Sequence, residues 1–370
     1  MNISEMLDDL AALVNVESPS HDVAALTASA DVLADVIERQ LGSRPTIVDG
    51  PAGPHVHWQG GPAPRVLLVG HHDTVFPLGT LARRPFSVAD GRATGPGVFD
   101  MKAGIVQAVY AVASLADRSG VEMLFTSDEE VGSESSRPLI EARAKACGAV
   151  LVLEPSADGG ALKTARKGVG TYELVVHGKA SHAGLEPEKG INSLVAAAEL
   201  IAQVATFGDM SRGTTVTPTM ASAGTAENVV PAETRVRVDV RVMDPAEKGR
   251  LEAAMGGLAT SVPGATFEVL GGLNRPPMHE SASASLFPVA QRAAAAAGLP
   301  EVRGVAVGGG SDGNFTAAAG VPTLDGLGAI GGGAHADHEF VEVDTMVDRA
   351  RLLAALLTEL TAAAAAATAS

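Results

Sequence analysis

The stretch RVLLVGHHDTVFPLGT, residues 65–80, decides how this chain folds. Its first six residues are an apolar run rich in Val and Leu, which is typical of a strand buried on both faces of a parallel sheet. Polar side chains follow at once, at His71, His72 and Asp73. In an open α/β sheet, ligands bind beyond the carboxyl ends of the strands. The stretch therefore predicts a strand that delivers polar groups to a binding crevice.

Two further apolar runs repeat this arrangement. VEMLFTS (121–127) leads into Glu129 and Glu130, and AVLVLE (149–154) ends in Glu154. Helical patterns lie between the runs, at 101–117 and 135–146. Strands that alternate with helices in this way are typical of βαβ units. The sequence therefore predicts an α/β fold with a mainly parallel sheet and with carboxylates at one of its edges.

The pattern changes at about residue 168. Alternating segments, typical of half-buried strands, run to about 275: TYELVVHG, TTVTPTMASAG, TRVRVDVRV and TFEVLGG. Two helical stretches interrupt them, near 190–206 and 245–260. The earlier pattern then resumes with a helix at 282–298, an apolar strand near 302–307 and a long Ala-rich helix. We expect a ferredoxin-like α+β domain at 168–276, inserted into a catalytic α/β domain made of 1–167 and 277–370.

Composition and charge limit the classes of protein that fit. The net charge of −16 argues against nucleic acid as a partner. No stretch approaches the length of a membrane span, and the N-terminus is typical of an amphipathic helix, not of a signal peptide. Cys147 is the one cysteine, so we expect no disulfide within the chain and treat Cys147 as a small apolar filler. The simplest location is the cytoplasm, with no membrane partner.

The polar groups at the strand ends suit a metal site. Asp100 follows a Gly-Pro-Gly turn, and His335 lies in the Gly-rich loop GGGAHADHEF. A single Asp before a helix is usually a cap, but several carboxylates in one crevice would repel one another unless a cation were bound. Mixed His and carboxylate ligands suit zinc, with cobalt or manganese as substitutes.

These motifs together resemble those of a known enzyme family. They are GHHDTVFPLGT, GPGVFDMKAG, TSDEEVGS, VLEP, GKASHAG, ENVVPAE, VDVRV and GAHADHEFVEV. From about residue 5 to 355, the chain resembles the zinc exopeptidases and deacylases that include glutamate carboxypeptidase, acetylornithine deacetylase and succinyl-diaminopimelate desuccinylase. The segments KASHAGLEPEKGINSL and GGGSDG are most similar to the glutamate carboxypeptidase branch.

The resemblance implies two zinc ions that share one ligand. The first ion would be bound by His71, Asp100 and Glu154, and the second by Asp100, Glu130 and His335. His338 is a rival to His335, but the family spacing to Glu339 selects His335.

The resemblance also assigns the residues around these ligands. Asp73 would hydrogen-bond the far ring nitrogen of His71, and Glu129 would be the general base. The peptide bond after Asp100 would be cis. His72 is expected to point away from His71, as a packing or hydrogen-bonding residue.

The inserted domain would be a lid and a dimerisation surface, so the resemblance implies a homodimer. His182 would stabilise the oxyanion, typically in the active site of the other subunit; its alternative is a loop histidine that caps a helix. Asn228 and Arg241 would hold the terminal carboxylate of the substrate. The alternative for Arg241 is one charge on a solvated strand face. Further candidates for the carboxylate pocket are Arg275 and the backbone of Gly309, Gly310 and Ser311.

We therefore expect a metal-dependent hydrolase that cleaves an amide bond next to a free carboxylate in a small-molecule amide or a peptide, similar to glutamate carboxypeptidase. The alternatives within this chemistry are an N-acyl amino acid deacylase, and a hydrolase of an unusual amide or an aromatic amine. A non-catalytic relative would have lost Glu129 or a ligand. A closed structural zinc site would carry cysteines, and a phosphoester hydrolase would need basic residues around the phosphate.

Overall fold

The structure is a computed structural model, and it describes residues 1–368. The chain divides into two compact units. Unit 1 comprises Met1–Ala165, Met278–Val307 and the chain from Ser311 onwards. Unit 2 comprises Arg166–Pro277 and Gly308–Gly310, and it contains the segment 168–276 that was expected to be inserted. Among the described residues, no helix combines the length and apolar character that crossing a membrane requires.

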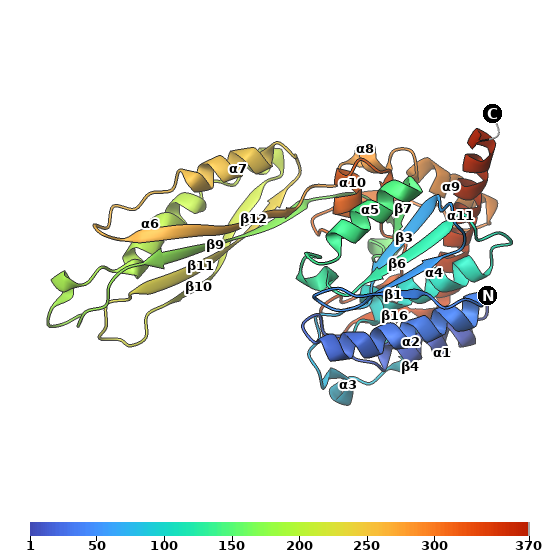
Figure 1. The fold of residues 1–370 in the computed structure, drawn as a ribbon, viewed down its shortest axis with the longest axis horizontal. Coiled ribbons are helices and arrows are strands. Elements are labelled where there is room, and N and C mark those ends of the chain that lie inside the picture. Colours follow the sequence, from blue (N-terminus) through green and yellow to red (C-terminus); the bar gives the residue numbers. More distant parts are fainter. Residues whose placement is uncertain (369–370) are drawn as a thin grey trace. The chain divides into compact units, whose positions relative to one another are not determined.

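A six-stranded sheet forms the centre of unit 1 (Figure 1). Its strands are β1 (Thr46–Val48), β2 (His55–Gln59), β3 (Val66–His71), β6 (Val121–Thr126), β7 (Ala149–Val152) and β14 (Thr323–Leu324). They lie in the order β1-β2-β6-β3-β7-β14. The pairs β6–β3, β3–β7 and β7–β14 are parallel, and β1–β2 and β2–β6 are antiparallel. The predicted mainly parallel sheet is confirmed.

Helices cover both faces of this sheet, which explains why its strands are continuous apolar runs. On one face, Val66 and Leu68 share a core with five helices: α1 (Ile3–Val14), α2 (Val23–Leu41), α4 (Ala103–Ala113), α9 (Phe287–Ala296) and α11 (Met346–Thr368). On the other face, Leu67 and Val69 pack against α5 (Arg137–Cys147). Neighbouring residues of β3 are therefore buried on opposite sides, and the strand has no polar face.

Two expectations for the C-terminal part of unit 1 were wrong. The helix expected at 282–298 is two helices, α8 (Glu280–Ser283) and α9, because Pro288 suits the first turn of a new helix. The strand expected near 302–307 is β13 (Gly304–Val307), but it pairs with β8 (Leu162–Arg166) outside the parallel sheet. The residues of β13 are half-buried or exposed, so this strand does not need the interior of a covered sheet.

A small antiparallel sheet, not predicted from the sequence, joins distant segments of unit 1. Its strands are β4 (Ser87–Ala89), β5 (Arg92–Thr94), β15 (Gly331–Gly332) and β16 (Phe340–Glu342), in the order β15-β16-β5-β4. The pairing of β16 with β5 sets Phe340 opposite Thr94. It thereby brings the loop of His335 beside the segment that leads to Asp100.

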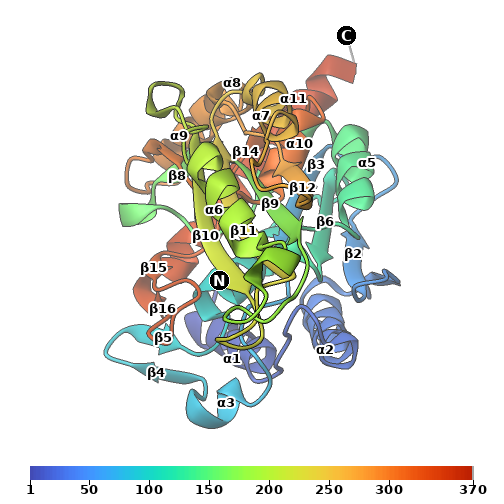
Figure 2. The ribbon, with the colours of Figure 1, turned by 90° about the vertical axis from the view of Figure 1, so that its left-hand side faces the viewer.

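Unit 2 is a four-stranded antiparallel sheet with helices on one face (Figure 2). Its strands are β9 (Gly168–His177), β10 (Thr215–Ala223), β11 (Glu233–Val242) and β12 (Thr266–Arg275), and its helices are α6 (Ser193–Val204) and α7 (Glu247–Gly256). The strand order β10-β11-β9-β12 and the β-α-β-β-α-β succession are those of the predicted ferredoxin-like fold. Along β11, buried valines alternate with charged residues, so the face without helices carries the charges.

Candidate metal centre

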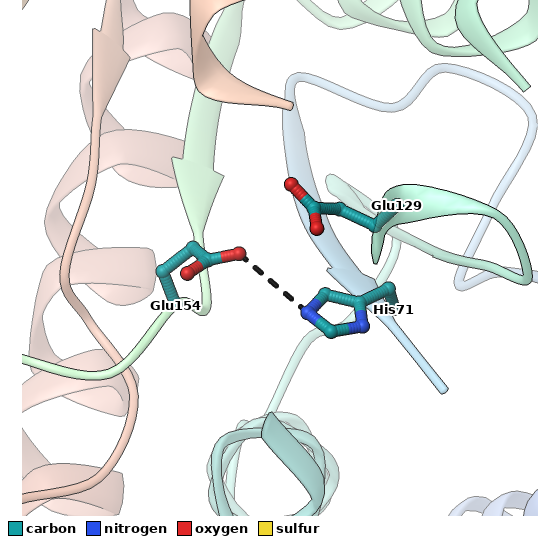
Figure 3. A group of neighbouring side chains, drawn as sticks. All are labelled: His71, Glu129 and Glu154. Carbon is teal, nitrogen blue, oxygen red and sulfur yellow. Dashed lines mark ion pairs between the residues drawn. The ribbon is translucent and has the colours of Figure 1, made fainter. Parts of the chain in front are cut away.

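The carboxyl ends of three adjacent parallel strands carry predicted site residues. His71 is the last residue of β3, and Glu154 follows β7. Glu129 and Glu130 follow β6 in a short 3-10 turn, Glu129–Val131. Figure 3 shows the side chains of His71, Glu129 and Glu154 converging from these three segments. The sheet order β6-β3-β7 is the reason that residues so far apart in sequence meet at one edge.

Asp100 reaches the same place from the loop between β5 and α4. Gly97 precedes it with φ +73°, and a Cβ there would lie 2.5 Å from Thr74 Cγ2, so the turn requires glycine. The Asp100–Met101 peptide bond is cis, as the resemblance implied.

Asp100 lies between the two predicted histidine ligands. His71 Nε2 is 3.3 Å from Asp100 Oδ1 and 3.6 Å from Glu154 Oε1. His335 Nε2 is 3.4 Å from Asp100 Oδ2 and 3.1 Å from Glu130 Oε2. The structure thus brings all five predicted ligands together, with one oxygen of Asp100 on each side.

Two triplets of these side chains offer ligand atoms that all lie within 4.8 Å of one another. They are His71, Glu129 and Glu154, and His71, Asp100 and Glu130. Both triplets include His71, and one includes Glu129, which we predicted as a base and not as a ligand. The division of the five ligands between two ions therefore stays a prediction.

Asp73 is buried behind His71 and orients it. His71 Nδ1 lies 3.0 Å from the main-chain oxygen of Asp73 and 3.3 Å from its Oδ1, so a proton on Nδ1 leaves the lone pair of Nε2 for a metal. The Asp73 carboxylate also accepts the N–H groups of Glu129 (3.3 Å) and Glu130 (3.2 Å). One carboxylate thereby fixes the ring of His71 and the turn that carries Glu129 and Glu130.

The neighbouring histidines are placed as expected. His72 points away from His71, with Nδ1 3.2 Å from Ser29 Oγ and Nε2 3.0 Å from the Pro54 carbonyl oxygen. His338 is exposed, and it is His335 that lies at ion-pair distance from Asp100 and Glu130.

The donor set fits a cation. His71 Nε2 and Asp100 Oδ1 are both buried and face each other at 3.3 Å, and neither makes a well-formed hydrogen bond within residues 1–368. Burial lowers the pKa of His71, but Asp100 and Asp73 outweigh it and hold that pKa well above its usual value. Burial raises the pKa of Glu130, and hydrogen bonds with Asp100 and Glu130 raise the pKa of His335 to about 10. Buried polar atoms that lack a partner, among several carboxylates, are the arrangement that a bound cation satisfies.

Unit 2 holds the predicted substrate residues in two separate places. His182 and Asn228 lie together, because the main chains of 181–183 and 228–230 pair beyond the ends of β9 and β11. Both residues are exposed, and His182 Nδ1 accepts the N–H groups of Gly184 (3.1 Å) and Leu185 (3.2 Å). His182 therefore makes a local cap, but it closes the turn at 183–185 and not the end of a helix, which was the alternative foreseen.

Arg241 and Arg275 lie at the opposite end of the same sheet. Both are in register with Val169, Arg241 from β11 and Arg275 from β12. From Glu233 to Arg241, β11 spans roughly 27 Å at about 3.4 Å per residue. Asn228 lies beyond Glu233, so a single unit 2 does not bring Asn228 and Arg241 to one small carboxylate.

The carbonyl oxygens of Gly309 and Gly310 and the polar groups of Ser311 have partners within the chain. The carbonyl oxygens of Gly309 and Gly310 accept from Arg166 Nη1, at 3.0 and 3.2 Å. Ser311 is fully buried; its N–H donates to Asn314 Oδ1 (2.8 Å) and its hydroxyl donates to Asp325 Oδ2 (2.6 Å). The visible role of Ser311 is to shape the start of α10 (Gly313–Ala318).

Two residues near the predicted ones were missed. Asp239 pairs with Arg241, and their spacing of two on a strand could have revealed it, since such residues share a face. Glu339 is fully buried and accepts three backbone N–H groups around Asp100. The sequence offered no signal for the contacts of Glu339 with the Asp100 loop, because these contacts depend on the unpredicted β5–β16 pairing.

Comparison with known proteins gives the relationships of the chain. Over 379 residues it is 30% identical to carboxypeptidase G2 of Pseudomonas sp. (strain RS-16), which covers 96% of this chain and 89% of that protein. In fold it is similar to aminopeptidase PepT of Bacillus cereus, with a TM-score of 0.78, 23% identity and coverage of 98% and 99% of the two chains. It is also similar to a dinuclear metal-binding peptidase of Bacillus subtilis, with a TM-score of 0.66, 17% identity and coverage of 96% and 97%.

A family model matches the part of the chain that contains every predicted site residue. This model describes peptidase family M20/M25/M40, and the match runs over residues 67–359. The matched span and the similarity to carboxypeptidase G2 over nearly the whole chain agree with the metal-type donor set at the strand ends. The chain is a metallopeptidase-type hydrolase, and it belongs to peptidase family M20/M25/M40.

Proposed function

We propose that this protein is a two-zinc hydrolase of the carboxypeptidase type. Its substrate would be an N-acyl or peptidyl amino acid with a free C-terminal carboxylate, and glutamate is the favoured residue because of the similarity to carboxypeptidase G2. The observation that carries the proposal is Asp100, whose two oxygens face His71 on one side and His335 on the other. Cobalt or manganese would substitute for zinc.

His71, Asp100 and Glu154 would hold one ion, and Asp100, Glu130 and His335 the other. Bound zinc would lower the pKa of a water molecule and polarise the substrate carbonyl. Glu129 lies beside His71 and Glu154, where its carboxylate accepts a proton from the attacking water. The water oxygen bonds to the carbonyl carbon, the C–N bond breaks, and Glu129 passes its proton to the leaving nitrogen. Asp73 keeps His71 and the 129–131 turn in place throughout.

Arg241 and Arg275 are proposed to bind the carboxylate of the substrate. Both pair with Val169, from opposite sides of β9; Arg241 is half-buried and Arg275 is buried. An arginine fork matches a carboxylate bidentately. This choice favours carboxypeptidase-like specificity over an unusual amide or an aromatic amine.

A homodimer is proposed because one chain separates its predicted substrate residues. His182 and Asn228 lie at one end of the unit 2 sheet, and Arg241 and Arg275 lie at the other. In a symmetric dimer, the partner subunit would supply His182 and Asn228 to the metal centre of the first chain. A cytoplasmic location stays a prediction from composition.

A mass-spectrometric panel tests the function. Zinc-loaded protein is incubated with N-acyl amino acids, dipeptides and their α-amides. The proposal expects release of glutamate or aspartate from substrates with a free α-carboxylate and little release from the matched amides. Preference for acetyl or succinyl groups regardless of the amino acid would select a deacylase. Absence of release from every substrate, before and after zinc loading, would contradict hydrolysis.

A further inference from the structure

Glu339 occupies an unusual position for a charged residue. It is fully buried in unit 1, yet it lies outside the set of proposed ligands. Its Oε2 accepts the N–H of Gly97 at 2.8 Å, and its Oε1 accepts the N–H groups of Phe99 and Asp100, both at 2.9 Å. One side chain thus holds the N–H groups of three of the four residues at 97–100, and the last of these is Asp100, the ligand proposed to bridge the two ions.

The backbone of Glu339 belongs to the loop that carries the proposed ligand His335. His335 lies four residues earlier, with φ +61°, and the loop is tightened by bonds from Ala336 N to Gly333 O (2.9 Å) and from Glu339 N to Ala336 O (3.1 Å). Directly after Glu339, Phe340 begins β16 and pairs with β5. Glu339 therefore stands where the loop of His335 and the loop of Asp100 meet.

The chemistry of this contact requires a carboxylate. Both oxygens of a carboxylate accept hydrogen bonds and neither donates, so the group can receive all three N–H groups. A glutamine would turn its NH₂ group towards at least one of these N–H donors. Burial raises the pKa of Glu339 to about 7, and the three backbone N–H groups act in the opposite direction. The buried ammonium of Lys102, which donates to the Val16 carbonyl oxygen at 3.0 Å, attracts the charged form of Glu339. Burying a carboxylate beside Asp100 is costly, which argues that the contact serves more than loop closure.

We propose that Glu339 is a positioning residue of the metal centre, which locks the Asp100 loop to the His335 loop and so sets two of the three proposed ligands of the second ion. The inference rests on the proposed two-metal function. It assigns to Glu339 no contact with substrate and no proton transfer.

Glu339→Gln tests the inference, with zinc affinity as its main readout. Competition with a chromogenic chelator should show one of the two sites, that of Asp100, Glu130 and His335, losing about 10- to 100-fold in affinity, which is typical when a partner of a metal ligand is removed. The turnover number should fall while KM changes little, because the carboxylate pocket is untouched. In cobalt-loaded protein, the visible absorption bands of the bound ion should shift.

Glu122→Gln is the matched control, because Glu122 is an equally buried glutamate of unit 1, bound to His57 and Arg143 away from the ligands. The Glu122→Gln variant should lose thermal stability, but its two zinc affinities and the absorption bands of its cobalt-loaded form should match those of the wild type. Glu339→Asp, which keeps the charge, serves if the glutamine variant does not fold, and it should show a smaller affinity loss of the same kind.

The inference would be overturned if either Glu339 variant kept both zinc affinities within twofold of the wild type and left the cobalt bands unshifted. Such a variant would lose only stability, as Glu122→Gln does. Failure of the wild-type protein itself to bind zinc would instead overturn the proposed function.

Discussion

At the scale of single residues, Arg241 is shaped by a neighbouring charge. Its Nε lies 3.0 Å from Asp239 Oδ1, and its Nη2 lies 2.9 Å from Asp239 Oδ2. One edge of the guanidinium is thus held by a carboxylate of the same strand. The Nη1 group has no hydrogen-bond partner within residues 1–368, so the end of the fork is the part that a substrate carboxylate would meet.

We predict that Arg241→Lys raises KM about 10-fold or more for a substrate with a free α-carboxylate and changes the turnover number little. Lysine keeps the charge but loses the planar fork. Steady-state kinetics with the acid substrate and its α-amide would measure this, and the variant and wild type should differ little on the amide. Arg237→Lys, on the same exposed face of β11, is the control and should leave KM unchanged. Equal KM values for wild type and Arg241→Lys would contradict the assignment.

The site residues at the strand ends could be predicted from the sequence, because each lies only a few residues after an apolar run. His71 directly follows an apolar run, and Glu129 and Glu130 come just after another, so a parallel sheet alone suffices to bring them together. Glu339 was not readable in this way. Its three hydrogen bonds reach residues 239 to 242 positions away, and they depend on a pairing of short strands that carry almost no apolar pattern.

At the scale of elements, β2, β6 and α5 meet at Glu122. This buried residue of β6 receives His57 Nε2 from β2 at 2.7 Å and Arg143 Nη2 from α5 at 2.6 Å. Cys147 Sγ donates to it at 3.4 Å, so Cys147 is a hydrogen-bond donor as well as the expected apolar filler. Burial raises the pKa of Glu122, but His57 and Arg143 outweigh burial and lower that pKa to about 2.

This network predicts a defined pH dependence of stability. Because the pKa of Glu122 falls from 4.5 in the unfolded chain to about 2, the ion pairs stabilise the fold above pH 4.5 and lose their effect as the pH falls towards 2. The contribution at pH 7 is on the order of 3 kcal/mol. Urea unfolding of chelator-treated wild type and Glu122→Gln should show a gap in unfolding free energy that narrows between pH 5 and pH 3. If the difference in unfolding free energy between wild type and Glu122→Gln stayed constant from pH 5 to pH 3, the ion pairs of Glu122 would not stabilise the fold as proposed.

The large elements could be predicted because their apolar periodicity is strong, as in β3 and β11. The misplaced elements are short or half-exposed. β13 has the same Val-rich composition as a core strand, and only its partner, β8, shows that it lies outside the parallel sheet. The break between α8 and α9 could have been read from Pro288, whose ring suits the first turn of a helix and not its interior.

At the scale of the whole molecule, the separation of Asn228 from Arg241 predicts that two chains build one site. Chains with His182→Ala and chains with Glu129→Gln should each be inactive alone. In a mixed dimer, one site would combine an intact metal centre with His182 of the partner subunit. A refolded equimolar mixture should therefore regain about one quarter of the wild-type rate.

Purification on two different affinity tags, one on each variant chain, would isolate the mixed dimer for this assay. Size-exclusion chromatography would establish its oligomeric state. No regained rate in an isolated mixed dimer would show that His182 acts within its own chain. A protein that is monomeric at assay concentration and fully active would contradict the dimer itself.

We infer that the edge formed by β6, β3 and β7 is a two-metal hydrolytic site in which Glu129 moves the proton. The most direct test compares the turnover of Glu129→Gln with that of the wild type at measured zinc content. We predict that the variant keeps two zinc ions per chain and loses about 10²- to 10⁴-fold in turnover number, the range typical of a lost general base. A variant that carries both ions and retains a near-normal rate would show that Glu129 is not the general base.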